Sequence, residues 1–211
     1  MSSLNFGLGK AKRALLAAAF CVTGLGAAQA TPVVYNFEAF SDSDVLTNQI
    51  AGLSFSNTTV LTAGISLNEL EFPPISGSNV VFDSGGALTI DFASPVFSVG
   101  GHFSYVTGLS FSAYDSLNNL LGTQLSSFGS NLLVSGDVGS MPNELLSFSS
   151  VGGLISRVVI TGNVAGGSFV MDDLAVDAGT TVPEPMTLAL VASVLVAGSL
   201  PGGWLRRRKQ A

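Results

Sequence analysis

Three residue types are almost missing from this chain. Cysteine, histidine and tryptophan each occur once in 211 residues, as Cys21, His102 and Trp204. Cys21 lies in an N-terminal apolar stretch that we expect to be removed, so we predict neither a disulfide framework nor a thiolate metal site in the mature protein. His102 stands alone, without an interior lysine or a Gly-x-Ser-x-Gly elbow, and indicates no hydrolase triad. We predict a protein that is not an enzyme.

Positive charge is also nearly missing from the interior of the chain. Of the 8 Lys and Arg residues, three lie near the N-terminus and four at the C-terminus, which leaves Arg157 alone between residues 31 and 181. The same stretch holds 13 of the 14 acidic residues, so its formal net charge is −12. Nucleic-acid binding needs clustered Lys and Arg and is therefore excluded as a function. A cation, or a neutral or cation-bridged glycan, is the natural complement, although net acidity also serves solubility alone.

The first thirty residues have the features of a secretory signal. Basic residues at positions 10–13 precede an apolar run over residues 14–28, and this run is shorter than the ~20 residues that a spanning helix needs. Ala28 and Ala30 place small side chains where a signal peptidase reads them, so we expect cleavage before Thr31. We therefore predict that residues 1–30 form a signal helix that signal peptidase removes.

The last thirty residues, 182–211, contain a second apolar segment. Met186 to Leu205 is long enough to reach across roughly 30 Å of hydrocarbon as a helix. A basic cluster follows directly and is expected to stay cytoplasmic by the positive-inside rule: Arg206, Arg207, Arg208 and Lys209. Pro201 and the two glycines after it interrupt the segment near its inner end, a break that an ordinary permanent anchor does not need. The sequence predicts a C-terminal transmembrane helix.

A short proline-rich motif precedes this helix: Val182, Pro183, Glu184 and Pro185. The motif, the apolar span and the arginine-rich end together resemble the C-terminal sorting signal called PEP-CTERM. The resemblance implies a Gram-negative host that makes exopolysaccharide. It also implies recognition by an exosortase, a membrane protease-transpeptidase that releases or transfers its substrate. The protein would then be held briefly in the inner membrane before it reaches the cell surface or the extracellular matrix. A plain single-pass anchor with a proline-rich stalk is the alternative.

The sequence of residues 31–181 predicts one all-β domain. Apolar residues alternate with polar ones at a period of two, as in Leu88-Thr89-Ile90-Asp91-Phe92, and no long helical period is present. The pattern favours a β-sandwich, most readily a jelly roll. Several segments also resemble the extracellular domains of proteins with the same tail, which are similar to galactose-binding-like and carbohydrate-binding jelly rolls. Ten strands are expected, at 33–40, 52–61, 79–82, 87–92, 96–105, 109–115, 120–128, 145–150, 155–161 and 168–176.

Acidic residues near both ends of the domain suggest a calcium site. In a jelly roll the first and last strands are commonly neighbours, so carboxylates on them can meet, and calcium takes six to eight oxygen ligands from such groups. The candidate ligands are Glu38, Asp42, Asp44, Asp172 and Asp173. Because neighbours on a strand alternate faces, one of the last two must point away. In the alternative interpretation, Asp42 and Asp44 only form turns.

Candidate glycan contacts are few. Stacking on a sugar ring needs an exposed aromatic side chain beside polar groups, and Tyr114 followed by Asn118 in a turn fits this requirement best. We predict an exported, non-enzymatic surface or matrix protein, associated with exopolysaccharide and with biofilm or floc formation. The alternatives are a carbohydrate-binding or glycan-active module with a specific sugar pocket, and an adhesin that pairs its edge strands with a protein partner.

Overall fold

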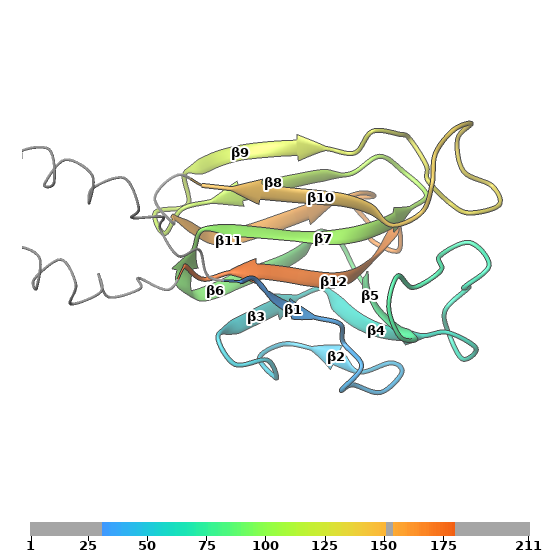
Figure 1. Cartoon of the computed structure of the whole chain (residues 1–211), viewed down its shortest axis with the longest axis horizontal. Coiled ribbons are helices and arrows are strands. Elements are labelled where there is room, and N and C mark those ends of the chain that lie inside the picture. The colour runs from blue at the N-terminus through green and yellow to red at the C-terminus, as the bar shows by residue number, and fades with distance from the viewer. Residues whose placement is uncertain (1–30, 151–153, 180–211) are drawn as a thin grey trace, which may run out of the picture. The chain divides into compact units, whose positions relative to one another are not determined.

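The computed structural model describes residues 31–150 and 154–179, which form strands and turns and contain no helix (Figure 1). They belong to one compact unit, Ala30–Thr180. In this part of the chain no helix is long and apolar enough to cross a membrane. Several sequence predictions lie outside the described residues, namely the signal peptide with Ala28 and Ala30, the motif at 182–185, the span at 186–205 and the basic cluster at 206–209.

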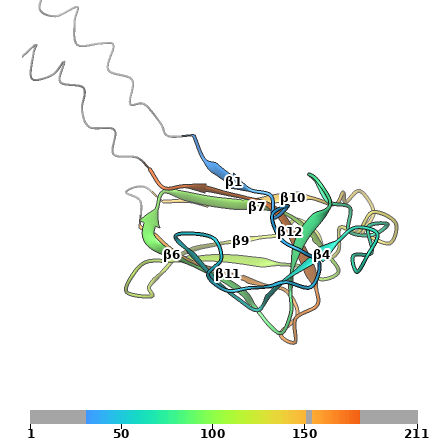
Figure 2. The same cartoon turned by 90° about the horizontal axis from the view of Figure 1, so that it is seen from below.

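The strands form two antiparallel sheets, which Figures 1 and 2 show as two layers. The seven-stranded sheet contains β1 (Val33–Tyr35), β2 (Val45–Leu46), β4 (Thr58–Thr62), β5 (Asn79–Asp83), β7 (Ser98–Tyr105), β10 (Glu144–Ser149) and β12 (Phe169–Asp177). Its order is β10-β7-β12-β5-β4-β2, with β1 added to β12. The five-stranded sheet contains β3 (Leu53–Ser56), β6 (Leu88–Val96), β8 (Ser110–Tyr114), β9 (Leu120–Leu125) and β11 (Ile155–Thr161), in the order β3-β6-β11-β8-β9.

The eight strands from β5 to β12 have the connectivity of a jelly roll. Successive strands alternate between the two sheets, except for the β8–β9 hairpin, which stays within one sheet. The resulting orders, β10-β7-β12-β5 and β6-β11-β8-β9, are the two four-stranded sheets of that fold. Strands β1 to β4 extend this framework at one side. The all-β sandwich expected from the sequence is confirmed, and the first and last strands are neighbours as predicted.

The core lies between the sheets and follows the alternation in the sequence. On β6, Leu88 and Ile90 are fully buried, whereas Thr89 and Asp91 between them are partly exposed. Phe103 of β7 lies against aromatic rings from both layers, with ring centroids 6.0 Å from Phe111 and 5.9 Å from Phe169. Fully burying a side chain of this size contributes about 1.5–3 kcal/mol relative to exposing it. The alternating apolar residues therefore stabilise the sandwich.

The strand predictions differ from the structure in three places. The strand expected at 33–40 ends at Tyr35. The segment 52–61 is two strands, β3 and β4, which belong to different sheets. Asn57 separates them with a φ of 56°, a left-handed conformation that ends an extended segment and that asparagine tolerates better than most residues. Strand β2 was not predicted, since two residues are too few to show a period.

Candidate functional site

The acidic residues predicted to bind calcium accept hydrogen bonds from backbone N–H groups and serine hydroxyls of the chain itself. Glu38, in the turn after β1, accepts hydrogen bonds through Oε1 from the backbone N–H groups of Ser78 at 2.9 Å and Asn79 at 2.7 Å. The carboxylate therefore holds the start of β5 and the residue before it. Glu38 is used as a structural hydrogen-bond acceptor.

Asp172 and Asp173 hold the adjoining turn. Oδ2 of Asp172 accepts from the N–H groups of Ile75 and Ser76, both at 3.0 Å, and Oδ1 of Asp173 accepts from the Ser76 hydroxyl at 2.7 Å. The expectation that one of them points away was wrong. The pairing of β12 with β7 shifts register between Asp172 and Ala175, and Asp173 has a φ of 49°, so the regular alternation is broken there. Burial raises the pKa of Asp172 to about 6, against the lowering effect of its amide donors.

Asp44 acts within its own turn, whereas Asp42 contacts the end of β4 and the loop after it. Asp44 accepts from the backbone N–H of Ser41 at 2.8 Å, and Asp42 accepts from the N–H of Thr62 at 2.9 Å and from the Ser66 hydroxyl. The Ser66 hydrogen bond is the main reason that the pKa of Asp42 lies below its usual range. Across residues 31–150 and 154–179, no group of three or more His, Cys, Asp or Glu residues has an arrangement that could hold a metal ion. Calcium binding stays a prediction from the sequence.

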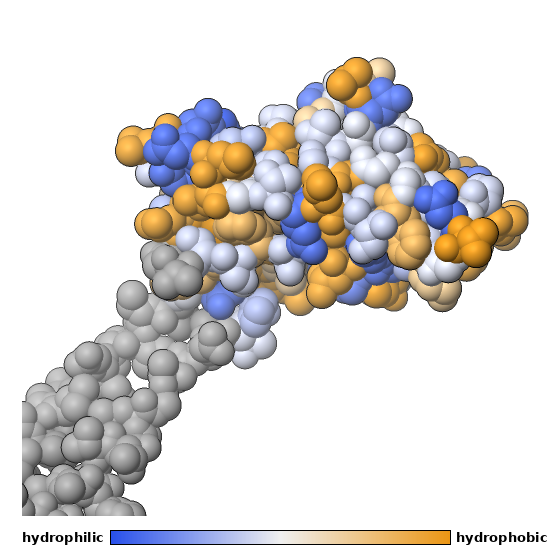
Figure 3. All heavy atoms as spheres, turned by 90° about the horizontal axis from the view of Figure 1, so that it is seen from above, coloured by the Kyte–Doolittle hydropathy of each residue, from blue (hydrophilic) through white to orange (hydrophobic). Residues whose placement is uncertain are grey.

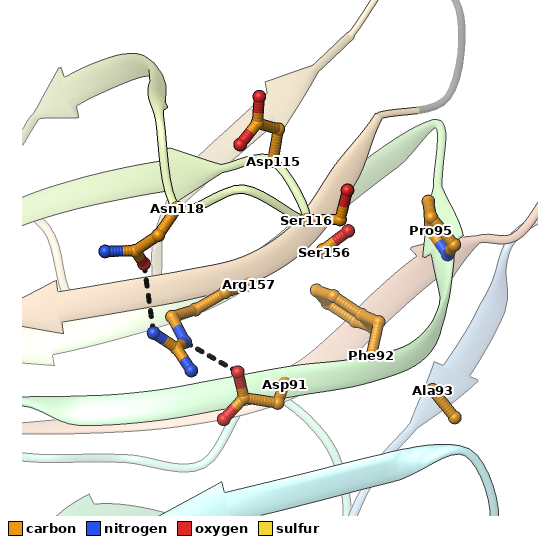
Figure 4. Close-up of a pocket in the computed structure, with 9 residues that line it drawn as sticks. All are labelled: Asp91, Phe92, Ala93, Pro95, Asp115, Ser116, Asn118, Ser156 and Arg157. Carbon is orange, nitrogen blue, oxygen red and sulfur yellow. Dashed lines mark hydrogen bonds and ion pairs between the residues drawn. The ribbon is translucent and has the colours of Figure 1, made fainter.

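A pocket of about 320 Å³ opens on the five-stranded sheet, where β6, β11 and the β8–β9 turn meet (Figure 4). Its wall combines one buried aromatic ring with charged, amide and hydroxyl side chains. The lining residues are Asp91, Phe92, Ala93, Pro95, Asp115, Ser116, Asn118, Ser156 and Arg157. The volume is at the small end of the range of about 300–1,000 Å³ for ligand pockets.

A large bulge in β6 creates this hollow. Ile155 of β11 pairs with Val96 and Arg157 pairs with Asp91, so residues 92–95 of β6 lie opposite Ser156 alone. Pro95 has no backbone N–H to give to a neighbouring strand, which favours the loss of pairing at this place. The N–H of Ala93 instead donates to the carbonyl of Gly52 at 2.9 Å. Ser156 therefore has no paired residue on β6, and it lines the pocket.

Arg157 is the centre of the polar wall. Its Nε donates to Oδ1 of Asp91 at 2.6 Å and its Nη1 donates to Oδ1 of Asn118 at 3.0 Å, as Figure 4 shows. The two charged side chains are 42% and 40% exposed, so the ion pair is open to a ligand and to solvent. One guanidinium thus fixes a carboxylate and an amide that come from different parts of the chain.

Two further groups complete the pocket. Asp115 accepts from the backbone N–H groups of Leu117 at 2.9 Å and Asn119 at 2.8 Å, and from the Asn119 side chain. These bonds fix the turn that carries Asn118, and they hold the pKa of Asp115 below its usual range. The hydroxyl of Ser156 is buried and has no hydrogen-bond partner in the described structure. A buried hydroxyl without a partner is costly, and it points to a group that is supplied from outside the chain.

The two predicted glycan contacts both lie near Arg157. Asn118 lines the pocket, while Tyr114 does not line it but is the direct cross-strand partner of Arg157 on β8. Asp91 is the partner of Arg157 on the other side, so the three residues form a row on the outer face of the sheet. Sequence reasoning missed Arg157 and Asp91. The signal was present, since Arg157 is the single cation of the domain and both residues take outward positions in alternating strands.

A second, smaller pocket of about 210 Å³ lies on the other sheet. It is lined mainly by apolar residues of β4, β5, β12 and the loop after β4, including Leu61, Phe72 and Phe82. Phe72 and Phe82 pack against the small buried cluster of Leu67, Val80 and Val170 under that loop. This hollow belongs to loop packing and offers few polar groups to a ligand.

No protein-family model and no curated protein sequence matches the chain. Among solved structures, the K2 cleaved adhesin domain of Lys-gingipain is 12% identical, with a TM-score of 0.44, and the match covers 69% of this chain and 98% of that one. A DUF4465 family protein from Bacteroides caccae is 13% identical, with a TM-score of 0.40 and coverages of 71% and 100%. A family 6 carbohydrate-binding module is 12% identical, with a TM-score of 0.35 and coverages of 66% and 95%. Similarity at this level assigns no function to the chain.

Proposed function

We propose that the domain is a non-enzymatic binding module of an exported protein, and that it holds extracellular polysaccharide in the pocket around Arg157. The observation that carries this proposal is the hydrogen-bonded set of Asp91, Arg157 and Asn118 in a hollow of about 320 Å³. Carboxylate, guanidinium and amide groups in fixed positions are suited to the many hydroxyls of a sugar. Phe92 gives the same hollow an apolar wall.

The pocket is poorly equipped for hydrolysis. A glycosidase needs one carboxylic acid that stays protonated near neutral pH, which requires a raised pKa. Asp115 has a lowered pKa because it accepts hydrogen bonds from the turn that it caps. Oδ1 of Asp91 already accepts a hydrogen bond from Nε of Arg157 at 2.6 Å. Binding without turnover is therefore the function that this geometry supports.

Pairing of edge strands with a partner protein is less favoured. The outer edge of β3 is covered, because the N–H groups of Leu53 and Phe55 donate to the carbonyls of Ile50 and Thr47. A side chain from the other sheet covers part of the β10 edge, since the backbone N–H of Ser147 donates to Oε1 of Gln124 at 2.7 Å. Covered edges of this kind protect a sandwich from adding strands.

The destination is proposed from the sequence. The signal at residues 1–30 would export the chain, and the PEP-CTERM-like tail at 182–211 would hold it in the inner membrane until an exosortase-type protease acts. The released domain would then join the exopolysaccharide of the surface or matrix, where biofilm or floc forms. The intact mass of the protein from its own host tests this step. Loss of Arg206 to Ala211 is expected, and a surface protein that keeps these residues would contradict exosortase processing.

Binding is tested with the full chain in mild detergent and exopolysaccharide purified from the producing cells. Co-sedimentation is run with calcium and with a chelator, for the wild type, Asn118→Ala and Asn68→Ala. The last variant is a matched control, because Asn68 is an exposed asparagine on the loop over the other sheet. We expect saturable binding that Asn118→Ala weakens by about 3- to 10-fold, the effect of one or two hydrogen bonds. No binding under either condition would refute the proposal.

A further inference from the structure

We infer that the pocket around Arg157 takes a neutral sugar unit through adjacent hydroxyls, and that Arg157 positions the recognition groups rather than attracting an acidic sugar. This inference rests on the proposed glycan-binding function and names the ligand class. The Arg157 guanidinium already donates to Asp91 at 2.6 Å and to Asn118 at 3.0 Å. Its charge is therefore largely matched within the protein.

The charges around the pocket disfavour an anionic ligand. Asp91 and Asp115 both line the hollow, against the single cation Arg157. A uronate carboxylate or a sulfate placed beside Arg157 would lie near both aspartates, and like charges in close proximity repel. Between residues 31 and 181 the chain holds 13 acidic residues and no other Lys or Arg, so the wider field has the same sign. A ligand without charge avoids this repulsion.

The remaining polar atoms suit hydroxyl groups. Arg157 uses Oδ1 of Asn118 and Oδ1 of Asp91, which leaves the Asn118 amide N–H₂ as a donor and Oδ2 of Asp91 as an acceptor. Neighbouring sugar hydroxyls each donate and accept, so a donor and an acceptor held by one guanidinium match such a pair. Replacing the guanidinium by an ammonium would keep the charge but lose the planar fork that holds both partners.

Ser156 gives independent support for a ligand. Its hydroxyl lies buried at the base of the β6 bulge with no partner in the described structure. A sugar hydroxyl that enters the pocket would supply the missing hydrogen bond. The face drawn in Figure 3 shows apolar side chains interspersed with polar ones.

The test uses oligosaccharides from partial hydrolysis of the producing cells' own exopolysaccharide, separated by anion exchange into neutral and acidic fractions. Binding of each fraction to the full chain in detergent is measured by calorimetry at low and high salt. We expect the neutral fraction to bind, with an affinity that changes less than about 2-fold with salt, because no net charge is attracted. Binding of the acidic fraction alone would overturn the inference but keep the proposed function. Binding of the intact polymer without either fraction would overturn the assignment to this small pocket, and no binding of any sample would refute both.

Three variants separate positioning from charge. Arg157→Lys should weaken binding of the neutral fraction at least about 10-fold, since two hydrogen bonds to charged or amide partners lose their geometry. Ser156→Ala should weaken it about 3- to 10-fold without lowering the unfolding temperature, because the hydroxyl has no partner in the free protein. Asn68→Ala should change neither. If Arg157→Lys binds the neutral fraction as tightly as the wild type does, whatever its salt dependence, Arg157 acts only as a charge. That result would overturn the inference.

Discussion

Two acidic regions of the domain differ in what their carboxylates accept hydrogen bonds from. At the turn around residues 75–79, Glu38, Asp172 and Asp173 accept from backbone N–H groups and from the Ser76 hydroxyl. At the pocket, Asp91 accepts from the guanidinium of Arg157 and keeps its second oxygen for another donor. The first region is occupied by the chain itself, whereas the second is open. Acidic residues that converge are therefore a sign of a site only when their oxygens remain available.

Backbone amides hold carboxylates in place elsewhere in the domain as well. Backbone N–H groups carry partial positive charge, so several of them pointing at one carboxylate stabilise its ionised form. Asp83 follows this pattern in the core, where it accepts from the N–H groups of Ser168 and Phe169 and from the Ser168 hydroxyl. Burial nevertheless raises the pKa of Asp83. Backbone amides and a serine hydroxyl thus hold this carboxylate within the fold.

Removing Asp172 is the strongest way to break the structural region. Asp172 is buried, and Asp172→Ala leaves the N–H groups of Ile75 and Ser76 without an acceptor. This change should lower the free energy of unfolding by about 2–4 kcal/mol. Asp172→Asn keeps one oxygen for these amides and should lose less than half as much. Chemical denaturation of both variants measures the difference. A loss below about 1 kcal/mol for the alanine variant would show that the turn does not depend on this carboxylate.

Substitution of a glycine in the same turn should have a smaller effect on stability. Gly77 has a φ of 55°, and a Cβ there would overlap the carboxylate of Glu38, which holds Ser78 and Asn79. Gly77→Ala should cost about 1–3 kcal/mol, from left-handed strain and displaced hydrogen bonds. Gly64→Ala is the control, since Gly64 has a φ of 75° with nothing near its Cβ and carries the strain alone. Equal losses for the two variants in thermal or urea unfolding would argue against the Glu38 contact.

The pH dependence of stability should report Asp172. Its pKa is raised to about 6 in the folded protein, above the value near 3.9 of an unfolded chain, so folding binds a proton in this range. The stabilisation is therefore complete below the unfolded pKa and is lost as the pH rises through about 6. Between pH 7.5 and 5 the wild type should gain about 1 kcal/mol relative to Asp172→Asn. Parallel pH profiles would contradict this. The comparison with the variant removes contributions from groups that do not interact with Asp172.

Substitutions in the pocket should change the stability of the domain very little. Arg157→Gln breaks an ion pair whose side chains are 42% and 40% exposed, and exposed pairs contribute less than about 1 kcal/mol. We expect an unfolding curve close to that of the wild type in urea. A loss comparable to that of Asp172→Ala would mean that Arg157 is part of the framework rather than of an open site.

Much of the fold could be predicted from the sequence, because alternation at a period of two directly shows which side of a strand is buried. The strand at Leu88–Phe92 and the neighbouring relation of β1 and β12 are examples. Strand β2 and the break at Asn57 were missed, since the first is too short for a pattern and the second depends on one backbone angle. The bulge at residues 92–95 was also missed. The sequence interrupts its pattern there, at Pro95, but does not show that one strand continues through the break.

The site was only partly predictable. Asn118 was named from its place after Tyr114 in a turn, and both lie next to Arg157 in the structure. The other site residues depend on the pairing register of the strands, which places Asp91 and Tyr114 on either side of Arg157. No local sequence pattern shows the register between strands that lie more than forty residues apart. The acidic cluster was chosen because its residues lie on or after the first strand and in the last strand, which are neighbours in a jelly roll. That placement does not reveal that the turn at 75–79 supplies hydrogen-bond donors to three of them.

The most direct test of the account is a calorimetric titration of the full chain and of Arg157→Gln with exopolysaccharide from the producing cells, beside urea unfolding of both proteins. The account predicts that the wild type binds saturably, that the variant binds at least about 10-fold more weakly, and that their stabilities agree within about 1 kcal/mol. Equal binding by the two proteins would contradict the assignment of the pocket as the glycan site.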